Sequence, residues 1–220
     1  MQEQYISMSA DGMQLDAVLA LPERAVGVVL MVPCAAPADN GLPAISTELV
    51  RAGFATLRFT HGGAAPTGGV GQHAYYVHAD IVLQARRMEA ALEWLRQEPA
   101  TRRLPCGLYG HGVAAAVVIQ LAAWQGPMLA ALAVCDAQAE LAGKAALERV
   151  RVPSLLIVSG RDPDITGLNR MAFSALHCNK QLEQLAQMAA PGSDQAHHQA
   201  ALLACDWYMH HFNGQASMMA

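Results

Sequence analysis

Four short runs of apolar residues constrain the fold of this chain more than any other feature of its sequence. None of the four contains a charged residue: they are 26–32, 106–109, 128–134 and 154–160. A continuous apolar run of this length is typical of a β-strand buried on both faces, as in a parallel sheet. Because a parallel sheet needs helices on both faces, the segments between these runs must supply helices.

The rest of the chain meets this requirement. Asp11-Gly12 stands between two alternating segments, 4–8 and 13–20, and this pattern predicts an antiparallel hairpin. Residues 54–59 predict a further strand, and 180–189 fit either a strand or a helix. Helical patterns occupy 43–52, 79–97, 113–124, 167–178 and 196–212. The sequence therefore predicts one α/β domain over residues 1–220, with a mostly parallel sheet, an N-terminal antiparallel hairpin and helices on both faces.

Composition and charge exclude several classes of protein. Apolar residues make up 53% of the chain and charged residues 15%, a balance that supplies a core and argues against disorder. The net charge is −4 and no basic run occurs, so nucleic acid is not an expected partner. No apolar run approaches the ~20 residues that span a bilayer, and the first residues lack a signal-peptide pattern. We therefore expect a cytoplasmic protein without a membrane partner.

The cysteines and histidines give no sign of a metal or cofactor. The five cysteines are scattered without a CxxC pair, which indicates reduced thiols. His197-His198 and His210-His211 are adjacent pairs, and neighbours on a helix point about 100° apart, so neither pair converges on one ion. The sequence predicts no metal site and no cofactor.

Residues 108–116, LYGHGVAAA, combine a strand end, a tight glycine turn and a helix start. Three further segments accompany this turn: DGMQLDAVLALPERAVGVVLMV (11–32), LVRAGFATLRF (49–59) and VPSLLIVSGRDPDI (152–165), the last followed by APGSDQAHH (190–198). Their order and spacing resemble the α/β-hydrolase fold, and most of all its small dienelactone-hydrolase-like branch. The resemblance spans nearly the whole chain.

The resemblance implies where the catalytic groups of a hydrolase would stand. The G-x-S-x-G elbow, which presents a nucleophilic serine on a strained turn, puts Gly112 in the serine's place and Val113 after it. The oxyanion loop falls on Pro33-Cys34, where Pro33 has no N–H to donate. Cys34 has no basic neighbour in sequence to form a thiolate, so a buried small residue is expected there.

The acid and the base of the triad fall later in the chain. The acid's place is taken by Asp162, with Asp164 as the alternative. The histidine's place is taken by Gln195, which cannot act as a base near neutral pH. Because the relay needs a nucleophile, a base and an orienting acid in contact, ordinary serine-hydrolase chemistry is not expected.

Two histidines remain as acid–base candidates. His111 stands beside the apex of the turn, where it either projects into a pocket or fills space beside the sheet. His197 lies two residues past the expected histidine, and a small loop shift would bring it, or less readily His198, to Asp162. The alternative for His197 is an ordinary exposed place at the start of the last helix.

Three functions follow from these residues. The first is a non-hydrolytic small-molecule binder or pseudoenzyme with a pocket at the carboxyl ends of the strands. The second is an enzyme of cyclase, lyase or isomerase type that uses His197 or His111 with Asp162. An esterase-like hydrolase is the weakest of the three. A homodimer or a partner subunit stays open. The pocket residues expected are Pro33, Cys34, Gly112, Val113 and Gln195, with the glycine-rich loop 60–72 as a rim or lid.

Overall fold

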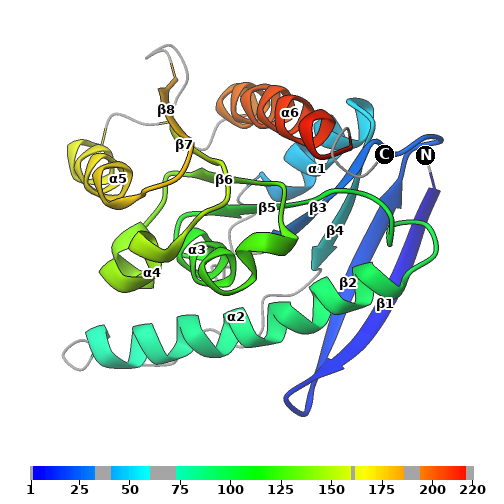
Figure 1. Ribbon diagram of the computed structural model, residues 1–220, viewed down its shortest axis with the longest axis horizontal. Helices are drawn as coiled ribbons and strands as arrows, with labels where there is room; N and C mark the ends of the chain where they lie inside the picture. Colours follow the sequence, from blue (N-terminus) through cyan, green and yellow to red (C-terminus); the bar gives the residue numbers. More distant parts are fainter. Residues whose placement is uncertain (1, 33–40, 60–72, 160–161, 186–193, 217–220) are drawn as a thin grey trace.

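The computed structural model describes residues 2–32, 41–59, 73–159, 162–185 and 194–216. Within these ranges the chain forms an eight-stranded sheet of order β1-β2-β4-β3-β5-β6-β7-β8 (Figure 1). The strands are β1 (Gln2–Ala10), β2 (Met13–Leu21), β3 (Gly27–Val32), β4 (Phe54–Phe59), β5 (Cys106–His111), β6 (Ala131–Cys135), β7 (Ser154–Val158) and β8 (Lys180–Gln184). The pairs β1–β2 and β2–β4 are antiparallel, and all the others are parallel. The carboxyl ends of the six parallel strands therefore meet at one edge of the sheet.

Helices cover both faces of the sheet (Figure 1). On one face α1 packs against α6, and on the other α2, α3, α4 and α5 follow one another across the strands. Their bounds are α1 (Leu42–Arg51), α2 (His73–Gln97), α3 (Ala114–Gln125), α4 (Lys144–Arg149), α5 (Pro163–Ala175) and α6 (Asp194–Ala216), with the short 3₁₀ helices η1 (Gly126–Met128) and η2 (Ala139–Ala142). None of the helices within the described residues is both long and apolar enough to cross a membrane.

The sheet separates two hydrophobic cores because successive side chains of a strand point to opposite faces. Leu108 and Val134 belong to the core under α2 and α3. Tyr109 and Cys135, their neighbours in sequence, belong to the core under α1 and α6. In this second core the Tyr208 hydroxyl donates a 2.6 Å hydrogen bond to the Leu108 carbonyl, which ties α6 to the central strand β5.

The structure confirms the predicted fold class, including the hairpin that turns at Asp11-Gly12. Residues 180–184, which fitted a strand or a helix, form the edge strand β8. Three helices differ from the prediction by more than one residue: α2 starts at His73, not at 79, α5 covers Pro163–Ala175, not 167–178, and α6 covers Asp194–Ala216, not 196–212. Helix α4 was not predicted, because six residues are too few for a clear apolar period. The loop 60–72 lies outside the described residues.

Candidate functional site

The bend between β5 and α3 is the centre of the candidate site. Gly112 forms its apex with φ 57°, a left-handed backbone conformation that favours glycine. The Gly112 N–H donates to the carbonyl of Cys135, and the Gly112 carbonyl accepts from the N–H groups of Ala115 and Gln138. A β-carbon built at position 112 meets no described atom within 4 Å. The bend is thus fixed to the end of β6, and nothing in the described part of the chain packs against its apex.

Beside the apex, a histidine and a carboxylate lie together. His111 is the last residue of β5, and its Nε2 is 3.7 Å from Oδ2 of Asp136, the residue that follows β6. The side chains are about one-fifth exposed, at 23% and 19%, so both can be reached from solvent. Cys135 is the ladder partner of His111, so its side chain lies on the same face of the sheet.

Asp136 is held in place by the end of the next strand. Its carboxylate accepts a 2.8 Å hydrogen bond from the Ser159 N–H and a second from the Ser159 hydroxyl. Burial raises the pKa of the Asp136 carboxyl, but the adjacent His111 imidazole and the hydrogen bonds from Ser159 outweigh burial and lower it below its usual value. The carboxylate is therefore ionised at neutral pH.

Two buried side chains lie beneath this pair. Burial raises the pKa of the Cys135 thiol well above its usual value, and the nearby Asp136 carboxylate raises it further. The protonated thiol is therefore a poor nucleophile by itself. Tyr109, also on this face, is fully buried, and its hydroxyl makes no hydrogen bond of acceptable geometry among the described residues.

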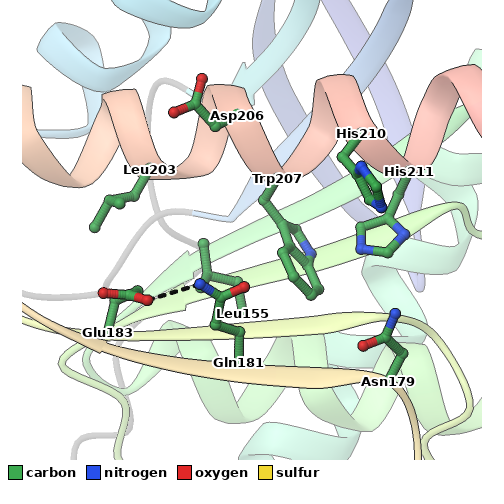
Figure 2. A pocket seen from close by; sticks show the side chains of 9 residues that line it. All are labelled: Leu155, Asn179, Gln181, Glu183, Leu203, Asp206, Trp207, His210 and His211. Atoms are coloured by element: carbon green, nitrogen blue, oxygen red, sulfur yellow. Dashed lines mark hydrogen bonds between the residues drawn. The ribbon is translucent and has the colours of Figure 1, made fainter.

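A separate cavity of about 390 Å³ lies between α6 and the strands β7 and β8 (Figure 2). Trp207 points from α6 toward Leu155 at its floor, and a 2.7 Å hydrogen bond joins Gln181 to Glu183 at its rim. The other lining residues are Asn179, Leu203, Asp206, His210 and His211. No residue of the bend after β5 lines this cavity, so it is not the pocket that the sequence predicted at the carboxyl edge.

Comparison with known proteins begins with sequence. No family model matches the chain. Two curated relatives, from two strains of Mycobacterium tuberculosis, have the provisional name phosphoribosyl transferase. Each is 28% identical over 97% of this chain, and the match covers 48% of the relative. The chain therefore spans about half the length of the curated relatives it matches.

Solved structures match over nearly the full length. A dienelactone hydrolase from Anabaena variabilis has a TM-score of 0.82 and 27% identity, covering 96% of this chain and 98% of its own. An esterase domain from Rhodothermus marinus and Est1E from Butyrivibrio proteoclasticus have TM-scores of 0.71 and 0.72 at 18% and 12% identity, each covering 94% of this chain and 98% of its own. The chain has the α/β-hydrolase fold.

In an α/β-hydrolase fold, the strand-to-helix bend carries the nucleophile. Here the bend has the required left-handed apex and open surroundings, but Gly112 supplies no side chain. Val113, the next residue, is the half-buried N-cap of α3. The bend after β5 is therefore a left-handed turn with a glycine at its apex.

Asp162, the expected acid of an α/β-hydrolase triad, serves as a helix cap. Its exposed carboxylate accepts hydrogen bonds from the N–H groups of Asp164 and Ile165, at 2.9 and 3.4 Å. Among the described side chains it pairs with neither His111 nor His197. His111 has Asp136 as its carboxylate partner instead, because the end of β6 lies next to β5 in the sheet.

The remaining predicted residues lie around α6 or outside the described ranges. His197 is 8% exposed and packs against Gly41 at the start of α1. The alternative expectation, an ordinary exposed residue at the start of the last helix, is therefore wrong. His198 is exposed, with its Nδ1 3.8 Å from the Glu48 carboxylate of α1. Gln195 is exposed on the first turn of α6. Pro33 and Cys34 lie outside the described residues.

Sequence reasoning missed Asp136, and it weighed Ser159 only as a nucleophile, a role that its place outside a strand-to-helix elbow does not favour. Each directly follows the end of an apolar strand, β6 or β7, at the edge where an open α/β sheet carries its ligands. A polar residue directly after an apolar strand is therefore the sequence signal that could have pointed to both residues. The contact between the two joins separate strands, so it does not show in any sequence motif.

Proposed function

We propose that this protein binds a small molecule reversibly at the bend after β5 and does not hydrolyse esters. The observation that carries the proposal is Gly112, which has the left-handed conformation of a nucleophile elbow and no side chain. Without a nucleophile at the apex, no covalent acyl intermediate forms there. The elbow backbone is then available for binding alone.

The backbone at the bend suits an oxygen of the ligand. Among the described residues, the N–H groups of Val113 and Ala114 at the start of α3 donate no hydrogen bond. Such first-turn N–H groups, with the positive end of the helix dipole, attract carbonyl or carboxylate oxygens. Gly112 lets such an oxygen approach the backbone closely. The ligand class proposed is therefore a small carboxylate, ester or lactone.

Chemical inertness is the first test. The full chain is incubated with a fluorophosphonate probe and with p-nitrophenyl acetate, beside a serine esterase as positive control. We expect no labelled serine and no hydrolysis above the buffer rate. Labelling at Ser159, the serine that contacts Asp136, or at any other serine contradicts the proposal, and Ser159→Ala then shows whether that residue is responsible.

Binding is the second test, and two glycines provide a matched pair. Gly112→Asn adds a side chain at the apex, and asparagine tolerates positive φ. Gly12→Asn makes the same change in the hairpin turn, at φ 73° and likewise in open space. In a calorimetric screen of small carboxylates and lactones, Gly112→Asn should abolish binding while Gly12→Asn retains it. Equal binding by both variants would place the ligand elsewhere.

The transferase name of the mycobacterial relatives concerns proteins about twice as long as the match. We therefore assign no phosphoribosyl transfer to this chain. The check is direct: the chain alone is incubated with phosphoribosyl pyrophosphate, Mg²⁺ and a panel of nucleobases, and pyrophosphate release is measured. Turnover by the chain alone would replace the proposal made here.

A further inference from the structure

We propose that His111, Cys135 and Asp136 form a binding site for one divalent transition-metal ion, with zinc as the first candidate. Each residue offers one ligand atom, and the three atoms lie within 4.8 Å of one another. In the part of the chain that the structure describes, no other group of three such residues converges in this way. The site goes beyond the proposed ligand-binding role, because it requires nothing of Gly112.

The sheet fixes two of the ligands relative to each other. His111 and Cys135 are ladder partners at the ends of β5 and β6, so their side chains leave the same face of the sheet side by side. Their separation of 24 positions in the chain explains why no zinc-like spacing is visible in the sequence. The pairing of β5 with β6 brings the two side chains together although they are far apart in the chain.

The third ligand is held by backbone conformation and by an outer partner. Asp136 has φ 46°, a left-handed backbone conformation that aspartate adopts more readily than most residues other than glycine. The Ser159 N–H and hydroxyl both hydrogen-bond its carboxylate. An outer hydrogen bond of this kind orients a ligating carboxylate in metal sites.

The donor atoms favour a transition metal over Mg²⁺ or Ca²⁺. Imidazole nitrogen, sulfur and carboxylate oxygen together are ligands of zinc, whereas Mg²⁺ and Ca²⁺ prefer oxygen alone. Zinc bonds of about 2.0–2.3 Å place tetrahedral ligand atoms about 3.3–3.7 Å apart. His111 Nε2 and Asp136 Oδ2 already lie 3.7 Å apart. The most widely separated pair of ligand atoms is at most 4.8 Å apart. These two atoms must approach each other by about 1 Å to bind one zinc ion, and a side-chain rotation can supply that movement.

Tyr109 is the independent observation that favours an ion here. Its ring is fully buried, and within the described residues its hydroxyl meets only the Cys135 thiol, a weak partner that is out of good hydrogen-bond geometry. A buried hydroxyl that lacks a good hydrogen-bond partner destabilises the folded chain. When the metal converts the Cys135 thiol to a thiolate, the sulfur becomes an acceptor for this hydroxyl. The bound ion would therefore give this hydroxyl a stronger acceptor than the neutral thiol.

The test uses the full chain without an affinity tag, stripped with chelator and dialysed. Zn²⁺ is titrated in competition with a chromogenic indicator, and Co²⁺ binding is followed by absorption. We expect one equivalent of Zn²⁺ and a sulfur-to-cobalt charge-transfer band. Less than half an equivalent of tight Zn²⁺, or a cobalt spectrum without that band, would overturn the proposal.

Matched variants locate the ion. Cys135→Ser should weaken zinc binding by roughly 100-fold or more, whereas Cys205→Ser, the same change at a buried cysteine of α6, should leave it unchanged. Ser159→Ala keeps all three ligands and the backbone N–H bond but removes the hydroxyl's hydrogen bond to the Asp136 carboxylate, so we expect binding about 10-fold weaker. Circular dichroism confirms that each variant folds. Zinc binding that survives Cys135→Ser but is lost in His198→Ala would show a surface site and refute the assignment.

Discussion

The imidazole of His197 lies directly against the α-carbon of Gly41, so that a β-carbon at position 41 would overlap the ring. Gly41 is the N-cap of α1, with φ 66°, and His197 is a buried residue on α6. The Gly41 carbonyl accepts a 2.9 Å hydrogen bond from the Ile45 N–H, which begins the helix. This contact fixes the two helices that cover one face of the sheet.

Gly41→Ala should therefore be strongly destabilising. The change adds left-handed backbone strain and an overlap with a buried ring, together about 2–4 kcal/mol of unfolding free energy. Urea unfolding followed by circular dichroism measures the loss. Gly12→Ala, at φ 73° in open space, should lose only the backbone part, about 1–2 kcal/mol. Equal losses in the two variants would show that His197 does not crowd position 41.

Substitutions of Asp162 distinguish a helix cap from a catalytic acid. Asp162→Ala removes the acceptor for two N–H groups of α5 and should cost about 1 kcal/mol, measured by urea unfolding. Asp162→Asn keeps a capping oxygen and should stay within a few tenths of a kcal/mol of the parent. If Asp162→Asn is as destabilised as Asp162→Ala, the capping assignment fails.

The order of strands and helices could be predicted from the sequence because burial leaves a local trace. Strands β3, β6 and β7 are buried on both faces and appear as continuous apolar runs. The left-handed apex at Gly112 could be predicted as well, because glycine between an apolar strand and an alanine-rich helix favours a tight turn.

Two features of the site were not predicted, for different reasons. Asp162-Pro163 is a strong helix-start signal, yet the resemblance to a hydrolase led to its interpretation as the triad acid. The contact of His111 with Asp136 depends on which strands are neighbours and on a left-handed backbone at position 136. Neither property has a periodic signature in the chain.

Tyr208→Phe tests how firmly α6 is attached to the sheet. The variant removes a fully buried 2.6 Å hydrogen bond to the Leu108 carbonyl and should cost about 1–2 kcal/mol, or roughly 2–8 °C in thermal midpoint. Tyr5→Phe is the matched control, because Tyr5 is 82% exposed and should show no change. Calorimetry on both variants gives the comparison, and an unchanged midpoint for Tyr208→Phe would contradict the role assigned to this bond.

His211, beside the cavity under α6, should make stability depend on pH. Burial lowers the pKa of His211 below its ordinary value of 6.5, and the neighbouring His210 lowers it further. As the pH falls below 6.5, the unfolded chain therefore takes up this proton before the folded chain does. The stabilising contribution is complete above that pH and declines between 6.5 and the lower pKa of the folded state.

His211→Gln removes the titrating group, so the variant should lose less stability than the parent between about pH 7.5 and about pH 5.5. Urea midpoints at both pH values measure the difference. His210→Gln should give an intermediate result, because it removes one of the two causes that lower the pKa of His211. An equal or larger pH dependence in His211→Gln would show that other groups dominate the acid destabilisation.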